Sequence, residues 1–428
     1  MLLASLLIIF MLLLVLGVPI AFSMLLSALA AVLLDGSFSS LLFIAQRMLY
    51  SIDSMSLLAV PLFIFAGELM GSGGITRRIM HFCNSLVGHV KGGMCHVSIL
   101  ACMIFAGVSG SSNADTAAVA SITVPTMRKE GYDDDVAVSC VAAGGTIGPI
   151  IPPSTTLLIY ATITGDSPGR LLMAGLLPGI LFGLSLMVVS SIYARKRNYP
   201  TRTRSSLREV GSSFLQAIPA LLAPAIILAG ISSGVFTATE SGAIAALYGL
   251  IVGICYRELN WKEVIRALKN TAMSTGSIMF IIAAAAPFGW VLTRARFPDM
   301  LIGFITSISS SLAGTTIVII AIMLLVGLFM EGMAAMMILV PVLQPLMVGM
   351  GYDPIQFGIL FLLCISIGAI TPPVGICLFT ACGVTNTPIS RIGKTVYIFA
   401  LGMLIATLIQ AFFPPLTTLV PNLLLGPA

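Results

Sequence analysis

Two short stretches of the sequence place prolines and glycines where backbone oxygens could bind a cation. They are GTIGPIIPPS, Gly145 to Ser154, and SIGAITPPVG, Ser366 to Gly375. Proline has no backbone N–H, so in a helix the carbonyl four residues before it loses its hydrogen bond. Clusters of such partly negative oxygens suit a hard cation such as Na⁺. The prolines are predicted to free the carbonyls of Gly145, Gly148, Pro149, Gly368 and Ala369.

The half-helix that begins at each Pro-Pro pair offers a binding site for an anion. Proline is tolerated in the first turn of a helix, and the free N–H groups and positive dipole end there favour an anion. One broken helix could therefore hold a cation and a carboxylate side by side. For a single break, a simple kink would be the better interpretation, but two breaks of the same kind favour ligand binding.

Each break is preceded by apolar segments that are too short to cross a membrane twice. The segment 96–125 has arms of about 11 or 12 residues, against roughly 20 for a span. The arms flank the polar tip GVSGSSN, Gly107 to Asn113. This pattern predicts a re-entrant helical hairpin, since irregular backbone at membrane depth is tolerated where it is packed in protein or lines a wet cavity. The segment 315–341 predicts a second hairpin with a less polar tip, GLFMEGM, Gly327 to Met333.

The two halves of the chain repeat one plan. EGYDDDVAVSCVAAGGTIGPIIPP, Glu130 to Pro153, aligns without a gap on MGYDPIQFGILFLLCISIGAITPP, Met350 to Pro373, 220 residues later. The shared Gly-Tyr-Asp, Ile-Gly and Pro-Pro argue against a chance match.

We therefore predict two inverted repeats, 1–194 and 214–428, which a basic cytoplasmic linker, 195–213, separates. In each repeat, scaffold helices precede a hairpin and a broken helix. The broken helices are predicted at 136–164 and 355–383. Inverted repeats with binding sites between them are typical of secondary transporters.

Composition predicts an all-α polytopic membrane protein. The 428 residues are 58% hydrophobic and only 9% charged, and long uncharged runs satisfy their backbone in lipid as helices. Continuous rather than alternating runs argue against a β-barrel. The apolar start, Met1 to Leu34, has no charged leading region and no convincing cleavage site, so we expect a retained membrane segment. Ten of the 21 Lys and Arg lie in two loops, 195–208 and 257–269, which indicates that both are cytoplasmic.

The cysteines, histidines and acids of the chain give weaker indications of chemistry. The eight cysteines show no CxxC spacing and lie mostly in apolar runs, which indicates buried thiols. The histidines, His81, His89 and His96, lack the i, i+4 spacing of a helical metal pair. Acids in or near apolar runs either couple ions or cap helices; they are Glu68, Asp115, Glu240 and Glu331. Because there are so few, Na⁺ coordinated by carbonyls is the better prediction.

Five stretches together resemble one transporter family. They are VPLFIFAGELMGSGG (Val60 to Gly74), FAGVSGSSNADTAAV (Phe105 to Val119), GTIGPIIPPS, TATESGAIAALYGL (Thr237 to Leu250) and ITPPVG (Ile370 to Gly375). In order, and over essentially the whole chain, they look like the large membrane subunit of TRAP (tripartite ATP-independent periplasmic) transporters.

The resemblance implies a mechanism and partners. A transport domain of hairpins and broken helices would slide against a scaffold, as in elevator-type transporters, and a Na⁺ gradient would drive uptake of an organic acid. No ATP would be used, and the chain has no GxxxxGK[ST] phosphate loop. The protein would be a transporter in the bacterial inner membrane and not an enzyme. Its partners would be a separate small four-helix membrane subunit and a periplasmic substrate-binding protein; sialic acid and C4-dicarboxylates are both compatible substrates.

Carried over by motif, the resemblance also implies two Na⁺ sites and a substrate site. The first Na⁺ site would comprise Ser109, Ser112, Gly145, Gly148, Ile151 and Pro153. The second would comprise Gly327, Gly368, Thr371 and Val374, and it would rely on backbone oxygens and Thr371 because the second tip lacks Ser and Asn. Substrate would contact Ser111, Asn113, Ser154 and Thr155, or an arginine would take its carboxylate instead: Arg47, Arg294 or Arg296.

Two other functions remain open at this point. A stand-alone Na⁺ symporter of the same broad fold would move a dicarboxylate or citrate without a binding protein. An intramembrane enzyme would need convergent catalytic groups, and the three histidines cluster in one polar stretch without acidic partners.

Overall fold

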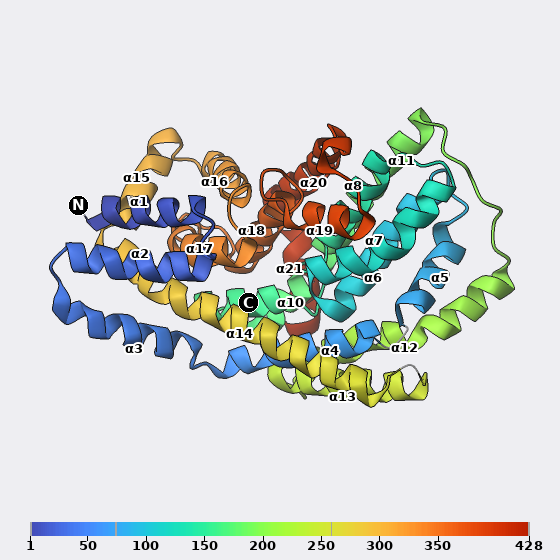
Figure 1. The fold of residues 1–428 in the computed structure, drawn as a ribbon, viewed down its shortest axis with the longest axis horizontal. Coiled ribbons are helices and arrows are strands. Elements are labelled where there is room, and N and C mark those ends of the chain that lie inside the picture. Colours follow the sequence, from blue (N-terminus) through green and yellow to red (C-terminus); the bar gives the residue numbers. More distant parts are fainter. Residues whose placement is uncertain (1, 73–74, 258, 427–428) are drawn as a thin grey trace.

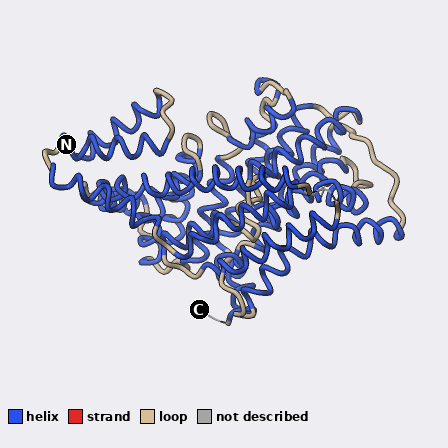
Figure 2. Tube along the Cα trace, turned by 60° about the horizontal axis from the view of Figure 1, so that its bottom comes forward, coloured by secondary structure: helices blue, strands red, loops and turns tan. Residues whose placement is uncertain are grey.

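The computed structural model describes residues 2–72, 75–257 and 259–426, and within these ranges it contains helices and no strand (Figure 1, Figure 2). Gly73 and Gly74, which end the first motif quoted above, lie outside the described residues. Six of the described helices are long and apolar enough to cross a membrane, or seven if the bent pair Leu41–Ile52 and Met55–Gly71 is one span. The prediction of an all-α multi-pass membrane protein is confirmed.

The N-terminal segment differs from the single membrane segment that we expected. It folds into two short helices, α1 (Leu2–Val15) and α2 (Ile20–Leu34), which pack against each other. Between them Gly17 adopts φ +77°, a left-handed conformation that favours glycine, and Pro19 precedes α2. The apolar pattern concealed this turn because the residues on both sides of it are equally hydrophobic.

One long helix and the helices grouped around it form what we call the frame. α14 (Trp261–Arg294) has 34 residues, a length of about 50 Å, and runs diagonally across Figure 1. It packs against α2, α4 and the second hairpin. The other frame helices are α3 (Leu41–Ile52), α4 (Ala59–Ser72), α12 (Leu207–Ser232), α13 (Ala238–Cys255) and α15 (Phe297–Ile308), with short 3-10 turns at Phe38–Ser40 and Met55–Leu58.

Capping boxes fix where two of the frame helices begin. Thr237 and Glu240 form one at the start of α13, and Asn260 and Glu263 form another at the start of α14. In each box two backbone N–H groups without helical partners are satisfied reciprocally. We had expected Glu240 to cap a helix through Thr239 or to serve as a first-turn acid; it lies in the first turn, and its capping partner is Thr237 instead of Thr239.

The first hairpin and first broken helix follow α5 (Ile75–Val87). The hairpin arms are α6 (Gly93–Ser109) and α7 (Ser112–Lys129), and they are longer than predicted, at 17 and 18 residues. α7 continues through Pro125 to Lys129, whereas the predicted hairpin segment ended at Pro125. The broken helix consists of α8 (Asp134–Gly145) and α9 (Thr155–Thr164), and α10 (Pro168–Ala174) and α11 (Leu176–Lys196) complete the half.

The second half repeats these elements in one register. α17 (Gly332–Gly349) begins and ends 220 residues after α7. Figure 1 shows α6 and α7 to the right of the centre and α16 (Leu312–Gly327) and α17 to the left, so the two hairpins lie on opposite sides. The remaining helices are α18 (Pro354–Gly368), α19 (Ile376–Thr385), α20 (Thr395–Phe412) and α21 (Pro415–Leu425), with a 3-10 turn at Ile389–Arg391.

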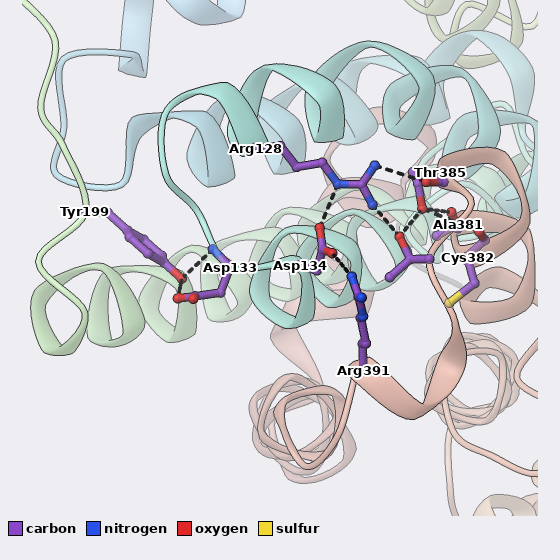
Figure 3. A network of polar contacts seen from close by, with 9 residues as sticks. Arg128, Asp133, Asp134, Tyr199, Ala381, Cys382, Thr385 and Arg391 are labelled. Atoms are coloured by element: carbon purple, nitrogen blue, oxygen red, sulfur yellow. Dashed lines mark hydrogen bonds and ion pairs between the residues drawn. The ribbon is translucent and has the colours of Figure 1, made fainter.

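Polar contacts at the far ends of α7 and α19 join the two halves (Figure 3). Arg128 donates hydrogen bonds to Asp134 at 2.6 Å and to the Thr385 carbonyl at 3.1 Å. A third bond runs from Arg128 to the Thr387 hydroxyl at 2.7 Å. Arg391 donates to the second oxygen of Asp134 at 3.4 Å. These bonds link the first hairpin to the second broken helix.

The start of the basic linker is also hydrogen-bonded to these elements. Arg197 donates two hydrogen bonds of 2.8 Å to the Asp135 carboxylate, and Thr395 of α20 donates a third at 2.5 Å. Burial by itself would raise the pKa of the Asp135 carboxyl, but the hydrogen bonds from Arg197 and Thr395 hold that pKa below its ordinary value. The broken helices and the start of the linker are thus tied together by charge.

Candidate functional site

Residues of both hairpin tips line a cavity of about 710 Å³. This volume is within the range of roughly 300–1,000 Å³ that small-molecule sites occupy. The first tip contributes Ser111 and Asn113 to its wall, and the second contributes Glu331. Frame helices α4 and α14 close the opposite wall with Glu68 and Ser277. The cavity therefore lies between the frame and the block of hairpins and broken helices.

The first tip fits closely against the first break. Gly110 adopts φ +60°, and a Cβ there would lie 2.6 Å from the Pro153 carbonyl oxygen. Only glycine permits both this backbone conformation and this approach. Pro152 and Pro153 are joined by a cis peptide bond, as are Pro372 and Pro373 in the second half. The structure thus brings the predicted ligand Pro153 to the hairpin tip.

A buried carboxylate stands at this contact. Asp115, in the first turn of α7, is only 2% exposed. Its Oδ1 accepts a hydrogen bond of 2.5 Å from the Ser109 hydroxyl, and its Oδ2 has no hydrogen-bond partner. A Cβ on Gly148 would lie 2.9 Å from that Oδ2 and 3.0 Å from the Ser112 nitrogen. Because an ionised carboxylate is rarely left unpaired inside a protein, this oxygen needs a cation or a proton.

Fewer carbonyls of the breaks lack a hydrogen bond than the proline rule predicted. Gly145 accepts a turn hydrogen bond from the Gly148 N–H at 3.2 Å, and the Pro149 carbonyl accepts one from the Ser154 hydroxyl at 2.5 Å. In the second break, the Thr371 N–H donates to Gly368 at 3.0 Å and the Cys377 N–H donates to Ala369 at 2.9 Å. The prediction of unpaired oxygens was therefore wrong at four of the five positions, because local turns replace the lost helical bonds.

The Gly148 carbonyl is the exception. No hydrogen bond to it occurs from any residue that the structure describes, and Gly148 is buried. The other carbonyls keep one lone pair each, since a carbonyl oxygen can accept twice. Gly148 therefore combines a free backbone oxygen with the nearby Asp115 carboxylate, which makes the first break suited to a cation.

The remaining predicted residues of the first site are placed around this pair. Gly145 lies against α7, where a Cβ would clash with the Thr116 side chain. Ile151 is buried, and its side chain packs against Gly179 of α11. Ser109 reaches the site through Asp115, and Ser112 begins α7 beside Gly148.

In the second break the glycine also packs against its hairpin, but only backbone atoms of Gly327 lie at the contact. A Cβ on Gly368 would lie 2.5 Å from the Gly327 carbonyl oxygen, so the two backbones are in contact. The Val374 N–H donates to the Leu328 carbonyl at 3.3 Å, and the Thr371 hydroxyl donates to the Ile367 carbonyl at 2.7 Å. Gly368 and Thr371 line a separate, mostly apolar cavity of about 350 Å³. The four predicted residues lie together, apart from the large cavity.

The predicted substrate residues divide into two groups. Ser111, Asn113 and Thr155 line the large cavity. Ser154 is fully buried and does not, because its hydroxyl donates to the Pro149 carbonyl and accepts from the Leu157 N–H at 3.1 Å. Ser154 therefore caps α9.

Sequence reasoning missed several residues of the cavity wall. Thr156, Ser274, Ser277 and Ser366 are among them. Ser274 and Ser277 lie three positions apart on α14, one face of a helix, and this spacing in an apolar run was an available signal. Nothing in the sequence indicated that α14 would face the hairpin tips.

The arginines that we considered as carboxylate partners lie elsewhere. Arg294 donates to Asp35 at 3.3 Å and to Ser40 at 3.1 Å, and its guanidinium lies 5.7 Å from the Trp290 ring centre. Arg47 lies 6.0 Å from the same ring. None of the three candidate arginines, Arg47, Arg294 and Arg296, lines the cavity. Among the described residues, no group of three or more His, Cys, Asp or Glu is arranged to hold a metal ion.

Comparison with known proteins gives one consistent result. Residues 7–416 match the family described as "Tripartite ATP-independent periplasmic transporter, DctM component". The sialic acid TRAP transporter large permease SiaM of Vibrio cholerae is 39% identical over 96% of both chains. The C4-dicarboxylate TRAP transporter large permease DctM of Pseudomonas aeruginosa is 38% identical over 91% of this chain and 93% of its own.

The fold is also similar to that of a solved membrane transporter. The crystal structure of the YdaH transporter of Alcanivorax borkumensis superposes with a TM-score of 0.60 over 90% of both chains. The sequence identity is 16%, so this similarity concerns the fold alone.

Proposed function

This chain belongs to the DctM component family of tripartite ATP-independent periplasmic (TRAP) transporters, and from that premise we propose that it couples uptake of an organic acid to a Na⁺ gradient. The observation that carries the proposal is the unpartnered Oδ2 of Asp115, which is buried against the break at Gly148. A site that offers a carboxylate and a free carbonyl, but no soft sulfur or imidazole donor in this pair, suits a hard cation such as Na⁺.

Asp115 extends the ion site that the motifs implied. Na⁺ would lie between the first tip and the first break, with the Asp115 carboxylate, the Gly148 carbonyl and the Ser109 hydroxyl as the nearest oxygens. Because Ser109 already donates to Oδ1, the second oxygen of Asp115 stays directed to the break. The second ion would use Gly327, Gly368, Thr371 and Val374: Gly368 contacts Gly327 and accepts from the Thr371 N–H, and the Val374 N–H donates to Leu328, next to Gly327.

Movement of one block past the other would give alternating access. The cavity has one wall on the frame and the other on the hairpins and broken helices. The hydrogen bonds of Arg128, Asp134 and Arg391 connect the first-repeat and second-repeat parts of the block of hairpins and broken helices. An elevator motion would therefore carry the tips and both breaks as one unit, with the bound acid between them.

The family places the chain in a system of several parts. We propose a small membrane subunit of the Q type as its partner in the bacterial inner membrane and a periplasmic protein that delivers the acid. The Na⁺ gradient would drive uptake through these parts, and no ATP would be used.

Reconstitution tests the proposal. The chain, the small subunit and the binding protein are placed in proteoliposomes, and uptake of labelled sialic acid or succinate is measured with a Na⁺ gradient, a pH gradient or neither. We expect uptake only with the Na⁺ gradient and only with the binding protein present. Uptake driven by the pH gradient alone would reject Na⁺ coupling, and uptake without the binding protein would favour the stand-alone symporter.

A further inference from the structure

The cavity that the two tips line carries acidic and no basic side chains among its described residues, although an organic acid that binds there is itself an anion. Three carboxylates line it: Asp115, whose charge the proposed Na⁺ would offset, and Glu68 and Glu331. The described residues of its wall include no Lys, Arg or His. A like charge that faces a ligand opposes its binding. The wall therefore limits how many negative charges a ligand can bring.

The two hairpin tips offer different seats for an anion. At the first tip the α7 N-terminus is capped by the neutral Ser111, whose hydroxyl accepts from the Ala114 N–H at a long 3.5 Å. At the second tip, 220 residues later, Glu331 accepts from the Met333 N–H at 3.0 Å and from the Ala334 N–H at 3.3 Å. The protein's own carboxylate thus fills the second seat, and only the first stays open to a ligand.

The rest of the wall is suited to hydroxyl groups. Its polar side chains are largely Ser, Thr and Asn, which both donate and accept. Glu68 accepts a hydrogen bond from Asn270 of α14 at 2.9 Å and faces the cavity from the frame. Carboxylate oxygens on opposite walls can only accept, so a ligand must present donors to them.

We propose that this cavity takes an acid with a single carboxylate and several hydroxyl groups, and that it rejects a C4-dicarboxylate. This inference rests on the proposed function and narrows its substrate. The carboxylate binds at the open N-terminus beside Ser111 and Asn113, and the hydroxyl groups donate to Glu331 and Glu68. A second carboxylate would meet Glu331 in place of those donors. The volume of about 710 Å³ also exceeds what a four-carbon acid fills.

Binding without the periplasmic protein tests the inference, because that protein makes its own selection. The chain and its small subunit are placed in lipid nanodiscs in NaCl or in choline chloride. N-acetylneuraminate, D-gluconate and succinate are titrated, and the melting temperature gives each half-saturating concentration. We expect both sugar acids to bind in NaCl at least about tenfold more tightly than succinate, since a site built for hydroxyl groups rejects a ligand without them.

Variants assign this preference to the wall. Glu331→Gln removes the like charge and replaces one acceptor oxygen with an amide donor, so we expect the preference for sugar acids to fall to about threefold or less. Because Glu331 also caps α17, Glu68→Gln is the second variant, with the same expected direction. Glu209→Gln, an exposed acid at the start of α12, is the matched control and leaves the preference unchanged.

The outcomes separate this inference from the proposed function. Succinate binding that is Na⁺-dependent and as tight as that of the sugar acids overturns the inference and leaves Na⁺-coupled transport intact. A preference unchanged in both Glu331→Gln and Glu68→Gln also overturns it. If no acid binds in NaCl better than in choline chloride, the proposed function itself fails.

Discussion

The two hairpin tips occupy equivalent positions in the two repeats, yet they use charge in opposite ways. In the first tip the carboxylate, Asp115, lies one turn inside the helix, and its free oxygen is directed to the break. In the second tip the carboxylate, Glu331, caps the helix itself. The residue at the position of Asp115 in the second repeat is Ala335, and at that of Glu331 in the first it is Ser111. One fold therefore supports a buried carboxylate with an unpartnered oxygen in one half and a helix N-terminus capped by a carboxylate in the other.

The two breaks, by contrast, share their packing. Gly148 approaches the first tip and Gly368 approaches the second, each too closely for a side chain. The difference between the halves thus lies in side chains, while the backbone contact that closes each site is common to both. Variants can therefore separate the shared element from the specialised one.

Removal of the Asp115 charge should have the largest effect. Asp115→Asn keeps the size of the side chain but removes a charged ligand, and we expect Na⁺-driven uptake to fall by about a hundredfold or more. Glu331→Gln should leave the Na⁺ dependence in place. Asp299→Asn, an exposed acid on α15, is the control and should transport normally. Equal Na⁺ dependence in Asp115→Asn and the wild type would remove the proposed distinction between the tips.

Alanine at either break glycine tests the shared element. A Cβ would lie 2.9 Å from Asp115 Oδ2 at Gly148 and 2.5 Å from the Gly327 carbonyl at Gly368. We expect Gly148→Ala and Gly368→Ala each to destabilise the protein by about 1–3 kcal/mol, with Gly368→Ala the larger, as a lower melting temperature. Gly383→Ala in α19, where a Cβ meets nothing within 4 Å, should lose no stability. Tolerance at Gly368 alone would show that the two breaks are not equivalent.

The second ion site should respond more weakly than the first. Thr371→Val removes a hydroxyl whose hydrogen bond is to the Ile367 carbonyl, and we expect the Na⁺ affinity of uptake to fall by about two- to tenfold. Thr407→Val removes the same kind of bond in α20 at a residue that lines neither cavity, and it is the matched control. An effect of Thr371→Val as large as that of Asp115→Asn would contradict the assignment of the dominant site to the first repeat.

The smallest effect concerns the polar block that carries both tips. The pKa of Asp135 is held below its ordinary value, so its contribution to stability is present above the unfolded pKa of about 3.9 and is lost as pH falls through the lower folded pKa. Asp135→Asn should therefore melt earlier than the wild type at neutral pH, and the difference should shrink progressively as the pH falls below about 4. A difference that stays constant across this range would mean that the charge of Asp135 does not stabilise the block.

Sequence patterns were sufficient for some features of this molecule and not for others. The breaks, the hairpins and their 220-residue register followed from Gly, Pro and polar tips, because these residue types have direct backbone consequences. The turn at Gly17 and the capping role of Ser154 did not follow, since they depend on conformation within uniformly apolar or polar runs. The carbonyl prediction failed because turn hydrogen bonds at Gly145 and Gly368 replaced the helical ones. The wall from α14 required tertiary contacts.

Direct binding of radioactive sodium to the chain and its small subunit in nanodiscs tests the central claim most directly. The wild type, Asp115→Asn and Glu331→Gln are titrated with Na⁺ in the absence of substrate and binding protein. The account predicts that Asp115→Asn loses the tighter class of Na⁺ sites, while Glu331→Gln binds as the wild type does. Unchanged sodium binding by Asp115→Asn would contradict the claim that this buried carboxylate holds the coupling ion.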